Sequence, residues 1–119
     1  MMKKVVLVTG ASSGIGLSIA NYLHFQKKYI VYGTSRKINN YSDFPFNLIG
    51  LDVTDKLSIQ RCISEILKKE SKIDILINNA GVGITGPLEE IPISEINKHF
   101  QTNVIGPILL AKEVLPSMR

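Results

Sequence analysis

The sequence alternates short runs of consecutive apolar residues with longer segments in which apolar residues recur every three or four positions. The short runs cover residues 5–8, 29–34, 47–51 and 73–77, and they predict four strands. Runs that are apolar at consecutive positions are expected to be buried on both faces. This favours a parallel sheet that carries helices on each side.

The longer segments predict three helices. Thr54 and Asp55 can cap the second helix, and the third begins after Pro92 and runs from about residue 94 to 115. The apolar positions of the three helices are, in chain order, Ile15, Ile19, Ala20 and Leu23; Ile59, Ile63, Ile66 and Leu67; and Ile96, Phe100, Val104, Leu110 and Val114.

This alternation of strands and helices predicts an α/β fold, a doubly wound parallel sheet of the Rossmann type with strand order 3-2-1-4. The chain of 119 residues is long enough for one domain with a core, over residues 1–119. It is too short for a nucleotide-binding domain plus a separate substrate domain.

The end of the chain at Arg119 coincides with the end of the third predicted helix. A fifth strand would normally follow and cover strand four, at residues 73–77. Without it, strand four is a long apolar edge, which folded proteins avoid because it pairs with other chains. We therefore expect a domain truncated before strand five. The alternative is a small natural protein that covers this edge by dimerising.

Composition excludes several classes of protein. The net charge of +4 comes from scattered lysines without interleaved aromatic residues, which argues against nucleic-acid binding. His24 and His99 have no carboxylate or cysteine at metal-ligand spacing, so no metal site is expected. The single cysteine, Cys62, is flanked by isoleucines and is expected to be buried, and it cannot form an internal disulfide. No segment is apolar enough for a signal peptide or a membrane span. We expect a cytoplasmic protein.

A glycine-rich segment, Thr9-Gly10-Ala11-Ser12-Ser13-Gly14-Ile15-Gly16, joins the first strand to the first helix. A strand that turns through glycine into a helix presents free backbone N–H groups and the positive end of the helix dipole. This is a site for a phosphate or diphosphate. The glycine spacing matches neither the Walker loop, Gly-x-x-x-x-Gly-Lys, nor the dinucleotide fingerprint Gly-x-Gly-x-x-Gly.

The pattern Thr-Gly-x-x-x-Gly-x-Gly resembles the short-chain dehydrogenase/reductase family. Asn78-Asn79-Ala80-Gly81, directly after the fourth strand, is similar to the family's Asn-Asn-Ala-Gly motif, and the resemblance covers essentially the whole chain. It implies that Asn78–Gly81 border a nicotinamide cofactor and brace the sheet, and that Asp52 accepts a hydrogen bond from adenine. A helix cap is the other interpretation of Asp52. The implied cofactor contacts are Thr9, Gly10, Ser12, Ser13, Gly14, Ile15, Gly16, Ser35, Arg36, Asp52, Val53, Asn78, Asn79, Ala80 and Gly81.

The choice of cofactor is expected to depend on the end of the second strand, which reads Thr34-Ser35-Arg36-Lys37. A carboxylate here would bind a ribose 2′-hydroxyl and repel a 2′-phosphate, but none follows before Asp43. Two cations beside two hydroxyl groups suit a phosphate, so NADP(H) is favoured over NAD(H). Arg36 is the expected anchor because a guanidinium can contact phosphate through two parallel bonds. The alternative is an exposed basic turn.

Asn103 is the candidate catalytic residue. It matches the family's catalytic asparagine, which organises a water linked to the catalytic lysine. Pro107, four residues later, has no N–H, so it cannot donate the usual helical bond to the Asn103 carbonyl. We therefore expect an irregular backbone that leaves this carbonyl free for a water. The alternative is an ordinary kinked helix with a surface asparagine.

The resemblance implies an enzyme that moves a hydride between a nicotinamide and a small-molecule carbonyl or alcohol, as a homo-oligomer when intact. The signature of its remaining catalytic residues, a Ser followed by Tyr-x-x-x-Lys, does not occur in the sequence. We therefore expect the cofactor-binding portion of an NADP(H)-dependent oxidoreductase, inactive by itself. A non-catalytic NADP(H)-binding module and a fragment that does not fold are the alternatives. Val82, Gly83 and Ile84 could line an apolar entrance, but the substrate cannot be identified from the sequence.

Overall fold

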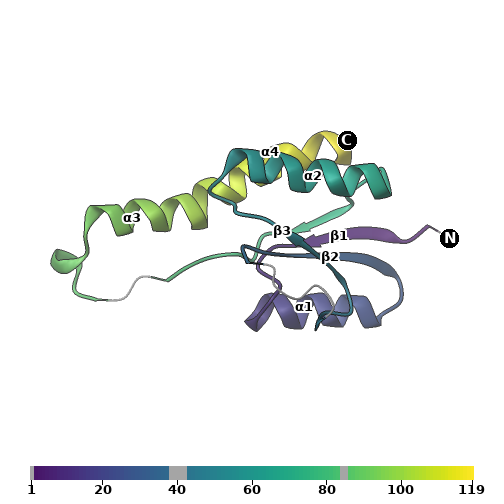
Figure 1. Ribbon diagram of the computed structural model, residues 1–119, viewed down its shortest axis with the longest axis horizontal. Helices are drawn as coiled ribbons and strands as arrows, with labels where there is room; N and C mark the ends of the chain where they lie inside the picture. The colour runs from purple at the N-terminus through teal and green to yellow at the C-terminus, as the bar shows by residue number, and fades with distance from the viewer. Residues whose placement is uncertain (1, 38–42, 84–85) are drawn as a thin grey trace.

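The computed structural model describes residues 2–37, 43–83 and 86–119 and contains a four-stranded parallel sheet (Figure 1). The strands are β1 (Lys4–Val8), β2 (Tyr29–Ser35), β3 (Asn47–Gly50) and β4 (Ile75–Ile77). Their order across the sheet is β3-β2-β1-β4, with Val6 of β1 beside Val31 of β2 and Ile75 of β4. This confirms the predicted Rossmann-type topology.

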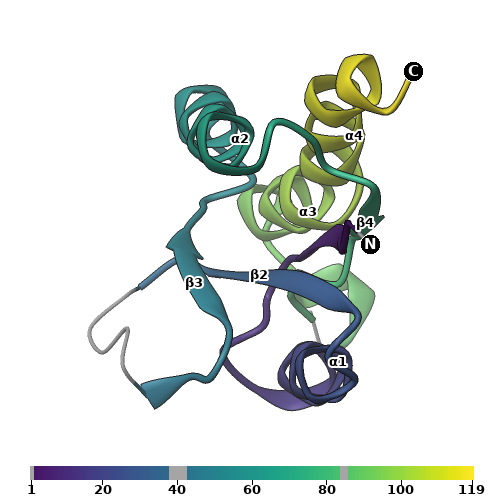
Figure 2. The same ribbon diagram turned by 90° about the vertical axis from the view of Figure 1, so that its right-hand side faces the viewer.

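The helices form a layer on each face of the sheet. α1 (Gly14–Phe25) covers one face, and α2 (Lys56–Glu70) and α4 (Gly106–Met118) lie side by side on the other (Figure 2). α3 (Ile93–Phe100) follows a short 3₁₀ turn, η2 (Leu88–Glu90), and continues through η3 (Gln101–Ile105) into α4. None of the helices in the described ranges is long and apolar enough to cross a membrane.

Each face of the sheet has its own apolar core, because successive side chains of a strand point to opposite faces. Val5 and Leu7 pack with Ile59 and Ile66 of α2, whereas Val6 and Val8 pack with Ala20 of α1. This confirms that β1 is buried on both sides. Cys62 is 1% exposed in the first core, and burial raises the pKa of its thiol to about 12. The thiol therefore packs as an apolar group.

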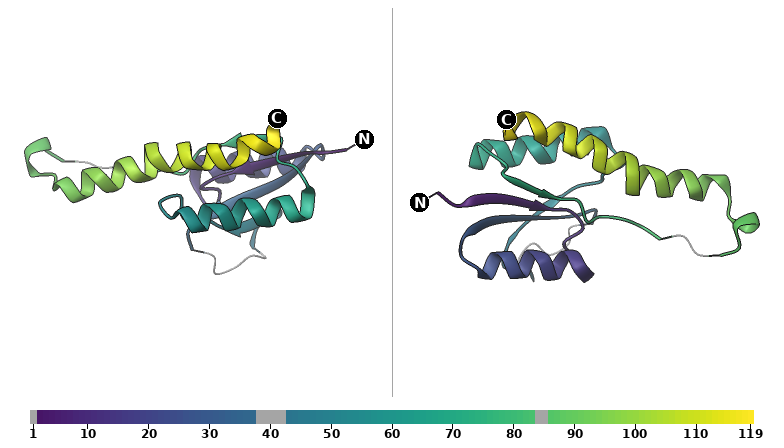
Figure 3. Two further views of the ribbon diagram at one scale, coloured as in Figure 1. Left: turned by 90° about the horizontal axis from the view of Figure 1, so that it is seen from above. Right: turned by 180° about the vertical axis from the view of Figure 1, so that it is seen from behind.

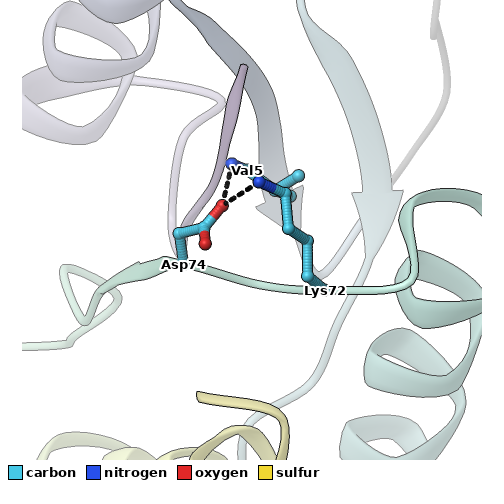
Figure 4. Close-up of polar contacts among 3 residues, drawn as sticks. All are labelled: Val5, Lys72 and Asp74. Carbon is cyan, nitrogen blue, oxygen red and sulfur yellow. Dashed lines mark hydrogen bonds and ion pairs between the residues drawn. The ribbon is translucent and has the colours of Figure 1, made fainter. Parts of the chain in front are cut away.

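β4 is shorter than the sequence predicted, beginning at Ile75 instead of residue 73. The Asp74 carboxylate accepts a hydrogen bond from Val5 N at 2.7 Å, and Asp74 N donates to Val5 O at 2.9 Å (Figure 4). Lys72 Nζ lies 3.1 Å from the same carboxylate. A side-chain oxygen thus replaces the backbone acceptor that a longer strand would provide.

The third helical region differs from the prediction in which apolar residues it buries. Leu110 and Val114 are fully buried, but Phe100 and Val104 are 55% and 41% exposed. The reason is that α3 and η3 extend beyond the sheet, as Figure 3 shows, so no layer of the described structure covers them. Within residues 93–118, all of which the structure describes, only α4 packs its apolar face against the sheet and α2.

Candidate cofactor-binding site

A cavity of about 470 Å³ lies at the carboxyl ends of the strands. In open parallel sheets this is the edge at which ligands bind. The described residues that line it come from the ends of all four strands and from η3: Gly10, Ser12, Ser13, Thr34, Ser35, Arg36, Lys37, Leu51, Val53, Asn79, Ala80, Gly81, Val82 and Thr102.

The glycine-rich loop packs against the segment after β4 so closely that two of its positions need glycine. Gly10 has φ +63°, and a Cβ there would lie 2.9 Å from the Cα of Ala80. A Cβ at Gly16 would collide with the Gly10 carbonyl oxygen and with Asn79 Nδ2. Gly10 therefore turns the chain into α1, and Gly16 lets that helix approach the loop.

The amino end of α1 has no capping side chain. Ser13 is its N-cap residue but makes no side-chain cap hydrogen bond, and the first turn contains no acidic residue. By contrast, Asp55 caps α2 and accepts a hydrogen bond from Leu57 N at 3.0 Å. The N–H groups at the start of α1 are therefore left for an anion, which the helix dipole also attracts. These donors suit the diphosphate of a dinucleotide.

Thr9 and Asn79 connect the glycine-rich loop to the segment after β4. Thr9 Oγ1 accepts hydrogen bonds from Asn79 N and Ala80 N, both at 2.9 Å. Asn79 Nδ2 donates to the carbonyl oxygens of Thr9 and Gly10, both at 3.2 Å. Thr9 is 1% exposed and does not line the cavity. Its hydroxyl group therefore positions the wall of the cavity.

Two positively charged side chains lie at the carboxyl end of β2. Arg36 and Lys37 are exposed and line the cavity beside Thr34 and Ser35. Ser35 Oγ donates to Lys37 O at 3.0 Å, and Thr34 Oγ1 accepts from Gly10 N at 3.3 Å. None of the described lining residues is acidic. This end of the cavity can attract an anionic group.

Asp52, which follows β3, lies outside the set that lines this cavity. Its Oδ1 accepts hydrogen bonds from Thr54 Oγ1 at 2.6 Å and Thr54 N at 2.9 Å. These two bonds, with a smaller contribution from the charge of Arg36, lower the pKa of the Asp52 carboxyl group. The helix cap is Asp55, so Asp52 is not the cap of α2. Contact with adenine stays a prediction for Asp52.

Asn103 lies in the π-helical segment η3, where Gly106 N–H donates to the carbonyl of Gln101, five residues back. Such segments occur frequently at functional sites. The Asn103 side chain accepts from Val82 N at 2.8 Å and donates to Val82 O at 2.7 Å. The irregular backbone expected at Asn103 is thus present. The two side-chain hydrogen bonds fix the position of Val82, which lines the cavity.

The model of one protein family, described as short chain dehydrogenase, matches residues 4–119. The chain belongs to this family. A 3-ketodihydrosphingosine reductase from Bacteroides thetaiotaomicron is 39% identical over 119 residues, which are the whole of this chain and 44% of that protein. The chain therefore spans less than half the length of this relative.

Solved structures of the family have the same fold. A short-chain dehydrogenase from Streptomyces avermitilis superposes with a TM-score of 0.92 at 37% identity, over the whole of this chain and 46% of that one. ElxO with NADP bound gives a TM-score of 0.91 at 34% identity, over 98% of this chain and 51% of that one.

The short chain dehydrogenase site brings together many, but not all, of the residues that the sequence indicated. Gly10, Ser12, Ser13, Ser35, Arg36, Val53, Asn79, Ala80 and Gly81 line the cavity, whereas Thr9, Gly14, Ile15, Gly16, Asp52, Asn78 and Asn103 do not. Ile15 is 74% exposed on the first turn of α1. Asn78 is exposed, with its Nδ2 3.4 Å from Pro107 O.

Sequence reasoning missed two lining residues, Leu51 and Thr102. Leu51 was assigned only to the third strand, although any residue at a strand's carboxyl end is a candidate for this edge of the sheet. Thr102 had no signal, because its place in the cavity depends on how η3 lies over the sheet. Val82, expected at an entrance, lines the cavity, and Ile84 is outside the described residues.

Proposed function

We propose that this chain binds NADP(H) in the cavity at the carboxyl ends of the strands. In the intact protein it would be the cofactor-binding part of an oxidoreductase that interconverts a carbonyl and an alcohol. The observation that carries the proposal is the pairing of an uncapped α1 N-terminus with Arg36 and Lys37 along one cavity. The two features offer two separate sites for negative charge, as a dinucleotide with a 2′-phosphate requires.

The residues present fit such a cofactor. The N–H groups at the start of α1 would hold the diphosphate, and Arg36 would orient the 2′-phosphate. Asp52 would accept a hydrogen bond from adenine, while Ala80 and Gly81 leave space for a ribose. When bound, the nicotinamide would supply or accept the hydride. ElxO, a structural neighbour solved with NADP bound, supports a nicotinamide cofactor for this site.

Asn103 is proposed as the catalytic residue of this part of the enzyme. Its carbonyl has no donor at the usual position four residues on, because that residue is Pro107. We infer that this carbonyl holds a water, as the family resemblance implies, while the side chain is hydrogen-bonded to Val82 N and O. The homo-oligomeric state and the cytoplasmic location stay predictions.

The test is a binding titration of NADPH and of NADH against the chain. We expect NADPH to bind at least about tenfold more tightly, as a charge-assisted bond to a phosphate would give. Arg36→Asp should abolish or reverse the preference. Lys68→Asp, which makes the same change of charge near the end of α2, is the control and should leave it unchanged. Equal binding of NADH and NADPH, or an Arg36→Asp variant with an unchanged ratio, contradicts the proposal.

A further inference from the structure

Seven lysines that are scattered along the sequence lie together at the end of the molecule opposite the cavity. β1 and β2 begin there, with Lys4 beside Tyr29, and α2 ends there. The segment after α2 lies at the same end, since Asp74 N donates to Val5 O. Figure 2 shows the molecule from this side. We call residues 2–4, 25–28 and 68–74 the basic end. Its lysines are Lys3, Lys4, Lys27, Lys28, Lys68, Lys69 and Lys72.

The basic end holds the whole excess of positive charge. Its seven lysines are accompanied by two acidic residues, Glu70 and Asp74, so it carries a formal charge of +5, whereas the full chain carries +4. Glu70 accepts a hydrogen bond from Tyr32, and Asp74 is paired with Lys72. The other six lysines are exposed, and none of them forms an ion pair with a described residue. Six ammonium groups are therefore available to a partner.

Interactions within the chain account for only some of these charges. Lys68 and Lys69 lie in the last turn of α2, where the helix dipole favours cations. Lys3 and Lys4 lie before and at the start of β1, and a sheet has only a small dipole. Lys27 has φ +62°, a conformation that favours glycine. Like charges that are close together also repel one another. A negatively charged partner would remove this repulsion.

Two large apolar side chains are exposed next to the lysines. Met2 is 79% exposed directly before Lys3, and Phe25 is 62% exposed at the end of α1, two residues before Lys27. The basic end contains no arginine and only one aromatic residue, which does not favour a nucleic acid. A lipid bilayer offers both kinds of contact that these side chains need. Its anionic headgroups attract lysines, and the acyl chains beneath them accept apolar side chains.

We propose that the basic end is a docking surface for an anionic lipid bilayer. The lysines contact the headgroups, and Met2 and Phe25 enter the boundary between headgroups and acyl chains. The cavity at the carboxyl ends of the strands then faces away from the bilayer, so docking leaves it open. This interaction is independent of the cofactor that the cavity holds.

The first test is sedimentation of the chain with lipid vesicles at an ionic strength of about 0.1 M. We expect binding to vesicles of phosphatidylcholine with about 30% phosphatidylserine, and much weaker binding to phosphatidylcholine alone. Salt at about 1 M should release the chain, because the Debye length then falls to about 3 Å. No binding to the phosphatidylserine vesicles, or equal binding to both kinds of vesicle, overturns the proposal.

The second test removes two charges from the basic end, in the double variant Lys3→Gln/Lys28→Gln. Each lysine near an anionic surface strengthens binding about fivefold, so this variant should bind the phosphatidylserine vesicles about tenfold or more weakly. Lys56→Gln/Lys98→Gln removes the same charge from the start of α2 and from α3, and should bind as the unmodified chain does. All four lysines are exposed, so both variants should keep the melting temperature. Equal weakening in the two variants overturns the proposal.

The third test separates a bilayer from a soluble polyanion. Phe25→Gln should weaken binding to the phosphatidylserine vesicles about threefold or more, because an apolar side chain no longer enters the bilayer. Leu88→Gln is the control, since Leu88 is 77% exposed on η2, outside the basic end. Vesicle binding that is equal in the two variants overturns the proposal. Binding of single-stranded RNA as tight as that of the vesicles also overturns it and indicates a nucleic-acid partner.

Discussion

Thr9 and Asn79, seventy positions apart in the sequence, hold each other through reciprocal hydrogen bonds. The Thr9 hydroxyl accepts from the Asn79 backbone, and the Asn79 side chain donates back to the Thr9 carbonyl. Through this pair the loop that opens α1 and the segment that follows β4 form a single wall of the cavity. The proposed phosphate site and the proposed nicotinamide side of the cavity are therefore mechanically connected.

Thr9→Val should destabilise the fold and weaken cofactor binding together. Valine has nearly the same shape but leaves the partly buried N–H groups of Asn79 and Ala80 without their acceptor. We expect a loss of about 2–3 kcal/mol in the free energy of unfolding. Thr9→Ser keeps the hydroxyl group, so its free energy of unfolding should fall much less. Denaturant unfolding measures the difference, and a Thr9→Val variant as stable as Thr9→Ser would show that these bonds contribute nothing.

Gly16→Ala should be severely destabilising although alanine is the better helix former. Its Cβ would meet the Gly10 carbonyl and Asn79 Nδ2, neither of which can move without breaking the wall. We expect the free energy of unfolding to fall by about 2 kcal/mol or more, and NADP(H) binding to be lost. At Gly83 an added Cβ meets nothing within 4 Å, so Gly83→Ala is the matched control. Similar melting temperatures for the two variants would refute the close packing.

The Asp74 carboxylate is expected to make stability depend on pH in acid. The hydrogen bond from Val5 N, and secondarily Lys72, lowers the pKa of Asp74 below its ordinary value of 3.8. The folded state therefore binds this proton less tightly than the unfolded chain. Its contribution is present above about pH 4 and is lost as the pH falls through the lowered pKa.

Asp74→Asn should therefore lower the melting temperature modestly at neutral pH, and the difference from the unmodified chain should shrink in acid. The effect is expected to be small because Asp74 is exposed. Thermal unfolding, followed by circular dichroism from neutral pH into acid, measures this difference in melting temperature. Glu89→Gln, on the exposed turn η2, should show no such difference. If the melting temperatures of Asp74→Asn and the unmodified chain differ by the same amount at every pH, ionisation of the carboxylate is not the source of the difference.

The chain by itself should bind NADPH but not oxidise it with a carbonyl substrate. The family's Tyr-x-x-x-Lys, which protonates the carbonyl oxygen, does not occur in this sequence. The measurement is the loss of NADPH absorbance with a panel of ketones and aldehydes, beside a binding titration of the same sample. Turnover by the purified chain would mean that another residue supplies the proton.

Much of the fold could be predicted from local patterns. Consecutive apolar residues at positions 5–8 predicted a strand buried on both faces, and the repeat of Ile59, Ile63 and Ile66 predicted the buried face of α2. The third helix could not be predicted as well. Phe100 and Val104 have the spacing of a buried face but are exposed, because burial depends on what lies opposite, which periodicity does not contain.

For the candidate site too, local motifs could be predicted from the sequence, whereas contacts between distant segments could not. The glycine spacing, Arg36 and the Asn-Asn-Ala-Gly motif could be read from the sequence because each is a short segment whose chemistry is local. Thr9 illustrates the limit. Its side chain is enclosed and accepts hydrogen bonds from Asn79 N and Ala80 N, which is a relationship between distant segments that the local motif does not contain. Contact of Thr9 with the cofactor stays a prediction.

By itself, the sequence determined the class of fold, the strand order, the family and the glycine-rich loop, because these follow from local periodicity and from motifs a few residues long. Only the tertiary structure decided that Asp55 and not Asp52 caps α2, and that the Asn103 side chain is hydrogen-bonded to Val82. Those facts depend on which donors and acceptors the folded chain brings within hydrogen-bond distance. For Asn103 and Val82, that pairing spans more than twenty residues.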